Sequence, residues 1–168
     1  NPLEIKKDFE IYNKGGMIKG EVSQYAALVN KNNIYIGKDA VIKPGAVLDA
    51  NEGPIYIDEG ALVMSNSVIQ GPCYIGRKSK IKMLAKIYEG TSIGEVCKVG
   101  GEVEQSIIHS YSNKQHDGFL GHAYLGQWVN IGADTNNSDL KNNYSTVKVY
   151  MNGKMIDSGL LLMGLLMG

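Results

Sequence analysis

Aliphatic residues recur at every sixth position over a long central stretch of the chain. Eight consecutive sites of this series carry β-branched aliphatic side chains: Ile57, Val63, Ile69, Ile75, Ile81, Ile87, Ile93 and Val99. The sites four residues further along are all small: Ala61, Ser67, Cys73, Ser79, Ala85, Thr91, Cys97 and Val103. A period of six fits neither an amphipathic helix nor an alternating strand. It predicts an all-β fold, a parallel β-helix of hexapeptide repeats, whose stacked coils bury one continuous aliphatic column.

The same six-residue phase extends toward the start of the chain. Ile36, Ile42 and Leu48 are in step with one another, and the longer gap before Ile57 indicates a loop inserted near residues 52–54. The repeat therefore begins well before the central stretch.

A polar segment precedes the repeat. Residues 3–13 have one weak apolar face, which predicts a short N-terminal helix that Gly15-Gly16 ends. We expect a lead-in helix and linker at residues 1–33 and the hexapeptide β-helix at residues 34–168. The chain begins without methionine and stops in mid-pattern, so we expect a fragment of a longer protein with an incomplete β-helix.

Two polar stretches interrupt the regular pattern. Residues 104–118 hold two of the three histidines and at most one short strand, at residues 107–108, so we expect a loop that leaves the coil. Residues 134–144 are rich in asparagine and have no apolar period, which predicts a second loop.

The C-terminal part of the chain carries a hairpin pattern. Val147, Val149 and Met151 alternate into Asn152-Gly153, which is typical of a β-hairpin with a type I′ turn. We expect this hairpin to project from the coils. The apolar residues 159–168 then predict a strand that re-enters the coil.

Composition narrows the possible functions. Lys+Arg and Asp+Glu both number 17, so no net field favours nucleic acid or an anionic membrane. Cys73 and Cys97 occupy small-residue sites and are expected to be buried packing residues, and no Cys/His cluster predicts a metal site. A signal peptide is lacking and the apolar C-terminal run is too short to span a bilayer, so we expect a cytoplasmic protein.

Candidate chemistry lies in the two polar stretches, because the functions of a repetitive rod reside on its loops. The candidates are Lys114, His116 and Asp117 in the first stretch and Asp134, Asn136, Asn137, Asp139 and Lys141 in the second. An imidazole with amides and cations suits a phosphorylated, hydroxylated small molecule, and histidine is the usual general base near neutral pH. We interpret His109 and His122 as solvated side chains and assign them no role.

The stretch from His116 to Thr135, HDGFLGHAYLGQWVNIGADT, carries a family resemblance. It resembles the acetyltransferase half of the bifunctional N-acetylglucosamine-1-phosphate uridyltransferase/glucosamine-1-phosphate acetyltransferase family. That family has a pattern close to H-L-T-Y-[IL]-G-D-x-x-[IL]-G-x-x-V-N-[IL]-G-A-G-T, and the two align without a gap. The wider combination of NKQHDGFLGH with NIGADTNNSDLKNNY is similar to the C-terminal part of sugar nucleotidyltransferase-like proteins.

The resemblance implies a structure and an activity. The β-helix would be left-handed and would form a homotrimer, with outward residues such as Tyr124 and Trp128 at the subunit contacts. It would transfer an acetyl group from acetyl-coenzyme A to an amino-sugar phosphate or a nucleotide sugar. An upstream nucleotidyltransferase domain would be the place where Mg²⁺ binds.

The resemblance also implies roles for individual residues. His116 falls on the catalytic base, which takes a proton from the amine, and Glu104 falls on a glutamate near that base. Asn130 matches a sugar-contacting asparagine, and Asp139 falls where another asparagine lies near the acceptor. The backbone at Ala133 corresponds to a contact with the acetyl end of the coenzyme.

Three departures favour a different pocket or a different role. Phe119 replaces a tyrosine that contacts the sugar phosphate, and the phosphate-binding lysine is lost, with Lys114 as its only candidate substitute. Asp134 replaces a glycine and puts a carboxylate near an anionic acceptor, a repulsion of about 4 kcal/mol at about 4 Å and an effective dielectric near 20. The alternative function is a non-catalytic trimerisation or regulatory module of a sugar nucleotidyltransferase.

Overall fold

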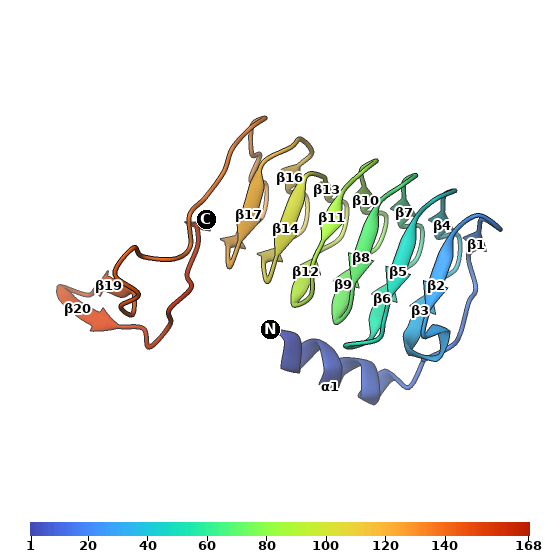
Figure 1. The fold of residues 1–168 in the computed structure, drawn as a ribbon, viewed down its shortest axis with the longest axis horizontal. Helices are drawn as coiled ribbons and strands as arrows, with labels where there is room; N and C mark the ends of the chain where they lie inside the picture. The colour runs from blue at the N-terminus through green and yellow to red at the C-terminus, as the bar shows by residue number, and fades with distance from the viewer.

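Three parallel sheets form the three faces of a rod in the computed structural model, which describes residues 1–168 (Figure 1). Sheet 1 contains β1 (Glu21–Val22), β4 (Val41–Ile42), β7 (Leu62–Val63), β10 (Lys80–Ile81), β13 (Lys98–Val99) and β16 (Asn113–Lys114). Sheet 2 contains β2 (Ala27–Val29), β5 (Val47–Asp49), β8 (Val68–Gln70), β11 (Lys86–Ile87), β14 (Glu102–Glu104) and β17 (Phe119–Gly121). Sheet 3 contains β3 (Ile34–Ile36), β6 (Ile55–Ile57), β9 (Cys73–Ile75), β12 (Thr91–Ile93), β15 (Ile107–Ile108), β18 (Tyr124–Leu125) and β21 (Leu166–Met167). The predicted parallel β-helix is confirmed, and it is consistent with the left-handed form that the resemblance implies.

The predicted inward positions are confirmed. Strand pairing aligns Ile57 with Ile75 and Ile75 with Ile93, so aliphatic side chains stack along the rod axis. All eight aliphatic sites and all eight small sites are buried. Burial of a Val, Leu or Ile side chain contributes about 1.5–3 kcal/mol, so this column is the main source of stability.

Small polar residues at the corners bond to the next coil. The Ser79 hydroxyl donates to the Gly94 carbonyl and accepts from the Cys97 N–H, at 2.7 and 2.8 Å. Ser112 likewise donates to the Gly126 carbonyl and accepts from the Val129 N–H. These two buried hydroxyls are therefore satisfied and link consecutive corners. Cys73 and Cys97 are buried and free, as expected.

The expectation of a loop at residues 104–118 is wrong. These residues continue the rod with two further strands, β15 and β16, which pair with β12 and β13. The period is hidden because this coil is shorter than the preceding ones and because Lys114 occupies an inward site, only 1% exposed. A lysine stem fills the space of an aliphatic residue, so the hydrophobic pattern misses it.

The coils also begin earlier than the expected boundary at residue 34. β1 and β2 pair with β4 and β5, and Val22 and Leu28 pack against the core. Their two-residue and three-residue strands are only partly buried, because they form the outermost coil. The boundary therefore lies within the residues that we expected to be a linker.

The predicted N-terminal helix is present as α1 (Pro2–Tyr12), followed by a short 3₁₀ turn, η1 (Lys31–Asn33). α1 lies beside the rod along sheet 3 (Figure 1), where Ile5 is buried and the Asn1 amide donates to the Gly90 carbonyl at 2.6 Å. Neither helix combines the length and the apolar character that crossing a membrane would require.

The C-terminal residues follow the predicted order. β19 (Lys148–Met151) and β20 (Lys154–Asp157) form the antiparallel hairpin, and both Asn152 and Gly153 have positive φ, as a type I′ turn requires. The hairpin projects from one end of the rod (Figure 1). β21 then returns to pair with β18, so the strand predicted at residues 159–168 rejoins sheet 3.

Candidate functional site

The sequence-predicted site residues gather around β17, the last strand of sheet 2. Two corners flank this strand: a first corner at residues 115–118, between β16 and β17, and a second corner at residues 122–123, between β17 and β18. Each corner carries a histidine, His116 or His122. The two histidines differ in the side chains that lie beside them.

At the first corner the His116 side chain is exposed and has no side-chain partner. Its backbone is held instead, because the His116 carbonyl accepts a hydrogen bond from the Lys114 ammonium at 2.7 Å. The next carbonyl, of Asp117, accepts from the Asp134 N–H at 3.0 Å. The structure therefore brings the first corner to residue 134 through the backbone and leaves the imidazole free in solvent.

Lys114 lies inside the rod, not on a loop. Its ammonium donates to the carbonyls of Gly100 and His116, at 3.2 and 2.7 Å. Burial lowers the pKa of this lysine from its usual value, and the Asp117 carboxylate opposes that shift. An ammonium enclosed in this way cannot reach a phosphate in solvent, so its placement argues against the substrate-binding role that we considered for Lys114.

The second polar stretch returns along β17. The Asn137 side-chain amide accepts a hydrogen bond from the Gly121 N–H and donates one to the Gly121 carbonyl, both at 2.9 Å. The side-chain oxygen of Asn136, Oδ1, accepts from the Phe119 N–H at 2.7 Å. Side-chain amides thus stand in for the next strand of sheet 2. This arrangement covers an otherwise open strand edge and fixes the position of Asp139.

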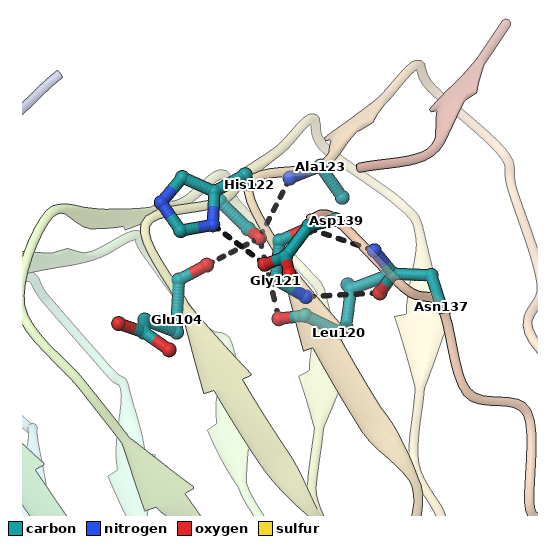
Figure 2. A network of polar contacts seen from close by, with 8 residues as sticks. Glu104, Leu120, Gly121, His122, Ala123, Asn137 and Asp139 are labelled. Atoms are coloured by element: carbon teal, nitrogen blue, oxygen red, sulfur yellow. Dashed lines mark hydrogen bonds and ion pairs between the residues drawn. The ribbon is translucent and has the colours of Figure 1, made fainter. Parts of the chain in front are cut away.

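At the second corner a carboxylate meets an imidazole. His122 Nδ1 lies 2.7 Å from Asp139 Oδ2, and the two side chains are 15% and 16% exposed (Figure 2). The His122 backbone is held on both sides, since its N–H donates to the Glu104 carbonyl and its carbonyl accepts from the Gly164 N–H. The pair is therefore fixed in place yet still reachable from solvent.

Glu104 and Phe119 lie near the second corner. Glu104 pairs with Gly121 in neighbouring strands, and its carbonyl faces the His122 N–H at 3.1 Å (Figure 2). The Phe119 ring and Asp139 Oδ2 both crowd the space where a side chain at Gly121 would lie, which explains the glycine. Asp139 therefore meets the His122 ring and the Glu104 carbonyl holds the His122 backbone, whereas the resemblance places Glu104 near His116 and Phe119 and Asp139 near the acceptor.

Asn130 and Ala133 lie apart from both histidines in the chain. Asn130 forms an isolated parallel bridge with Asn113, which extends sheet 1 by one residue, and its side chain is exposed. Ala133 is also exposed, next to Gly132, where an added Cβ would meet nothing nearer than 3.9 Å. This part of the backbone is open to an approaching ligand.

His122 is the residue that sequence reasoning missed, although a signal existed. Glu104 pairs with Gly121 and Ile108 with Leu125, so consecutive coils here are offset by the same number of residues as His122 and Asp139. Extending the coil spacing through residues 134–140 would have stacked these two side chains. No three side chains of His, Cys, Asp or Glu gather into a metal-binding group.

Comparison with known proteins supports the family resemblance. No family model matches the chain. The bifunctional protein GlmU of Marinobacter nauticus is 33% identical over 120 residues, which cover 69% of this chain and 24% of that protein. GlmU of Bifidobacterium longum is 31% identical over 145 residues, covering 77% of this chain and 30% of that protein.

A solved structure shares the fold. A Bacillus cereus protein provisionally assigned as an acetyltransferase superposes with a TM-score of 0.54 at 11% identity, over 70% of this chain and 72% of the other. That likeness supports the β-helix alone. The chain thus spans less than a third of the length of these curated relatives, and the resemblance first seen in residues 116–135 is confirmed.

Proposed function

We propose that this homologue of the bifunctional GlmU proteins is the acyl-transferring β-helix of a sugar-1-phosphate nucleotidyltransferase-type protein. It would transfer an acetyl group from acetyl-coenzyme A to the amine of an amino-sugar phosphate or a nucleotide sugar. The observation that carries this proposal is the sequence similarity to GlmU, together with a β-helix that ends in the corners where the matched motif lies. The expected cytoplasmic setting and an upstream domain that binds Mg²⁺ belong to the same proposal.

The geometry supports a surface for the two substrates around β17. The exposed backbone at Gly132 and Ala133 leaves room for the acyl end of the coenzyme, and Asn130, also exposed, lies two residues earlier in the chain. The bound thioester would supply an activated acyl carbon, and the protein would supply orientation and a proton acceptor. The resemblance assigns that acceptor to His116.

Acetyl transfer by the full-length protein tests the proposal. We would measure release of free coenzyme A from acetyl-coenzyme A with glucosamine 1-phosphate and with a nucleotide-linked amino sugar as acceptors. Removal of a general base costs roughly 10²–10⁴-fold in rate, so His116→Ala should lose at least tenfold if His116 is that base. A smaller loss in an active, folded protein excludes His116 from the role.

A homotrimer is a further part of this proposal. Trp128 is 75% exposed and stacks on Tyr111 with ring centroids 4.8 Å apart, and Tyr124 is also exposed. Exposed aromatic residues of this kind are enriched at protein interfaces, and closed cyclic symmetry limits the number of subunits. Light scattering of the full-length protein at several concentrations should give three subunits, and a stable monomer would contradict the proposal.

A second candidate function rests on Lys114. The Lys114 ammonium is enclosed in the rod, and Phe119 has no hydroxyl. Neither residue therefore supplies the polar contact that the resemblance implies for a sugar phosphate. The β-helix would then be a non-catalytic trimerisation or regulatory module. Calorimetry of the full-length protein with acetyl-coenzyme A separates the candidates, because an acyltransferase should bind the coenzyme and the module should show no heat of binding.

A further inference from the structure

We propose that the proton acceptor of this site is His122, oriented by Asp139, in place of His116. This inference rests on the proposed acyl transfer, and it changes which corner of β17 performs the chemistry. It places the acceptor amine and the acyl carbon at the second corner, and not at Ala133, whose neighbour Asp134 bonds to the first corner.

The pair has the arrangement that a histidine base requires. Asp139 Oδ2 accepts a hydrogen bond from His122 Nδ1–H, which selects the tautomer whose Nε2 carries a free lone pair. Nε2 has no hydrogen-bond partner in the chain, and in Figure 2 it points away from Asp139. The ring is therefore oriented by one nitrogen and available through the other.

Both members of the pair are held by parts of the chain that lie far away in sequence. The Asp139 carbonyl accepts from the Met163 N–H at 2.9 Å, and Leu140 forms an antiparallel bridge with Leu162. The Gly164 N–H donates to the His122 carbonyl at 2.9 Å. One returning segment, residues 162–164, thus fixes the backbone of both partners, which is how an active site keeps a base in register with its substrate.

The backbone at His122 is in the left-handed region, with φ of 49°. This conformation is uncommon for a residue other than glycine, asparagine or aspartate, and such residues cluster at functional sites. A β-helix corner here tolerates the conformation at other residues too, so the angle alone has no functional meaning. The inference therefore rests on the carboxylate partner and the free ring nitrogen.

The first corner lacks these features. The His116 imidazole is exposed, and only its backbone carbonyl is bound, by Lys114. A general base is most effective when a neighbouring group holds its tautomer and orientation. The two histidines stand at opposite ends of β17, with five residues between them, and only His122 has a side chain that orients its ring.

With His122 as base, every bond and proton of the acyl transfer is accounted for. His122 Nε2 takes a proton from the acceptor amine while the amine nitrogen forms a bond to the acyl carbon of the thioester. The carbon–sulfur bond breaks with its electron pair on sulfur, and the proton passes from His122 to that sulfur. The products are an amide and free coenzyme A, and His122 is neutral again.

Kinetics of the full-length protein test the inference, with three variants and a matched control. His122→Gly suits the left-handed backbone and leaves a space for free imidazole, whereas His122→Asn keeps an amide donor toward Asp139 and lacks Nε2. Asp139→Asn can donate to Nδ1 and so reverse the tautomer. His109→Asn is the control, because the His109 ring packs beside Tyr124, with ring centroids 5.0 Å apart, and has no carboxylate partner.

We expect kcat to fall by roughly 10²–10⁴-fold in His122→Gly, His122→Asn and Asp139→Asn, with KM for acetyl-coenzyme A within about threefold of the wild-type value. Added imidazole should restore part of the kcat of His122→Gly but not of His122→Asn, a rescue that a structural role would not show. His109→Asn should match the wild type.

Two results would overturn the inference without affecting the proposed function. One is a kcat of His122→Gly within about threefold of wild type while His116→Gly loses most of its activity. The other is a folded His122→Gly protein with low kcat that imidazole does not restore. If the wild-type protein transfers acetyl to neither acceptor, the proposed acyl transfer fails first, and this inference falls with it.

Discussion

The two corners of β17 carry the same functional group in different surroundings. At the first corner, His116 is fixed through its backbone by the buried Lys114 ammonium, and its ring is free. At the second corner, His122 is fixed through its ring by Asp139, and its backbone is bound to Glu104 and Gly164. The difference arises because residues 136–140 return along β17 and pass the second corner with a side chain aimed at the imidazole.

The position of a histidine in the family motif does not determine which side chains lie beside it in the folded chain. His116 begins the stretch that matches the family pattern, and local sequence alone identifies it. His122 acquires a partner only when the chain has travelled one further coil and come back. A motif can therefore point to the correct end of the rod while the orienting contacts lie at the other corner.

Among the variants that test the difference between the two corners, Gly121→Ala should have the largest effect on kcat. A Cβ at this position would lie 2.6 Å from Asp139 Oδ2 and against the Phe119 ring, so the carboxylate must move away from His122. If His122 is the base, kcat should fall by roughly 10²-fold or more with a small loss of stability. Gly132→Ala, where an added Cβ would meet nothing nearer than 3.9 Å, is the control for stability alone and should unfold like the wild type. Unchanged kcat in Gly121→Ala would show that the pair is not needed.

A smaller effect is expected for Asn137→Ala, which removes the support of the pair and not the pair itself. The Gly121 N–H and carbonyl would both lose their partner, and leaving such buried groups unsatisfied costs roughly 1–3 kcal/mol. Urea unfolding measures this loss. Ser138→Ala, at an exposed neighbour without a side-chain hydrogen bond, should stay within about 0.5 kcal/mol of wild type. Equal stability of the two variants would contradict the strand-like role of Asn137.

The smallest effect concerns the first corner and depends on pH. Burial lowers the pKa of Lys114 below its usual 10.5, so between the folded and the unfolded pKa the unfolded chain binds more protons. Stability contributed by this residue should therefore rise as pH increases through the lowered folded pKa toward 10.5. As pH rises toward 10.5, the urea midpoint of wild type should increase relative to that of Lys114→Met. Lys98→Met, at an exposed lysine on the adjacent strand, should show the same pH dependence as wild type.

Much of the fold could be predicted from the sequence because the rod repeats one packing problem. Each inward site faces the same neighbours above and below, so Ile57, Ile75 and Ile93 reveal the coil without knowledge of distant contacts. The hairpin at Asn152-Gly153 was equally accessible, because its turn chemistry is local.

The prediction failed where a polar residue took an apolar place. Lys114 has an apolar stem and a charged head, and the head is satisfied by two backbone carbonyls inside the rod. Judged by hydrophobic periodicity, such a charged residue counts as evidence for a loop. The second corner is hidden for a separate reason. The prediction of a loop at residues 134–144 gives them no coil offset, and the stacking of Asp139 on His122 follows only from that offset.

The tautomer of His122 tests the central claim most directly. In the full-length protein labelled with ¹⁵N-histidine, a long-range ¹H–¹⁵N spectrum at a pH where the ring is neutral reports which nitrogen carries the proton. We predict a protonated Nδ1 and an unprotonated Nε2 at His122, with the opposite tautomer gained in Asp139→Asn. A wild-type His122 that carries its proton on Nε2 would have no lone pair facing the substrate and would contradict the account.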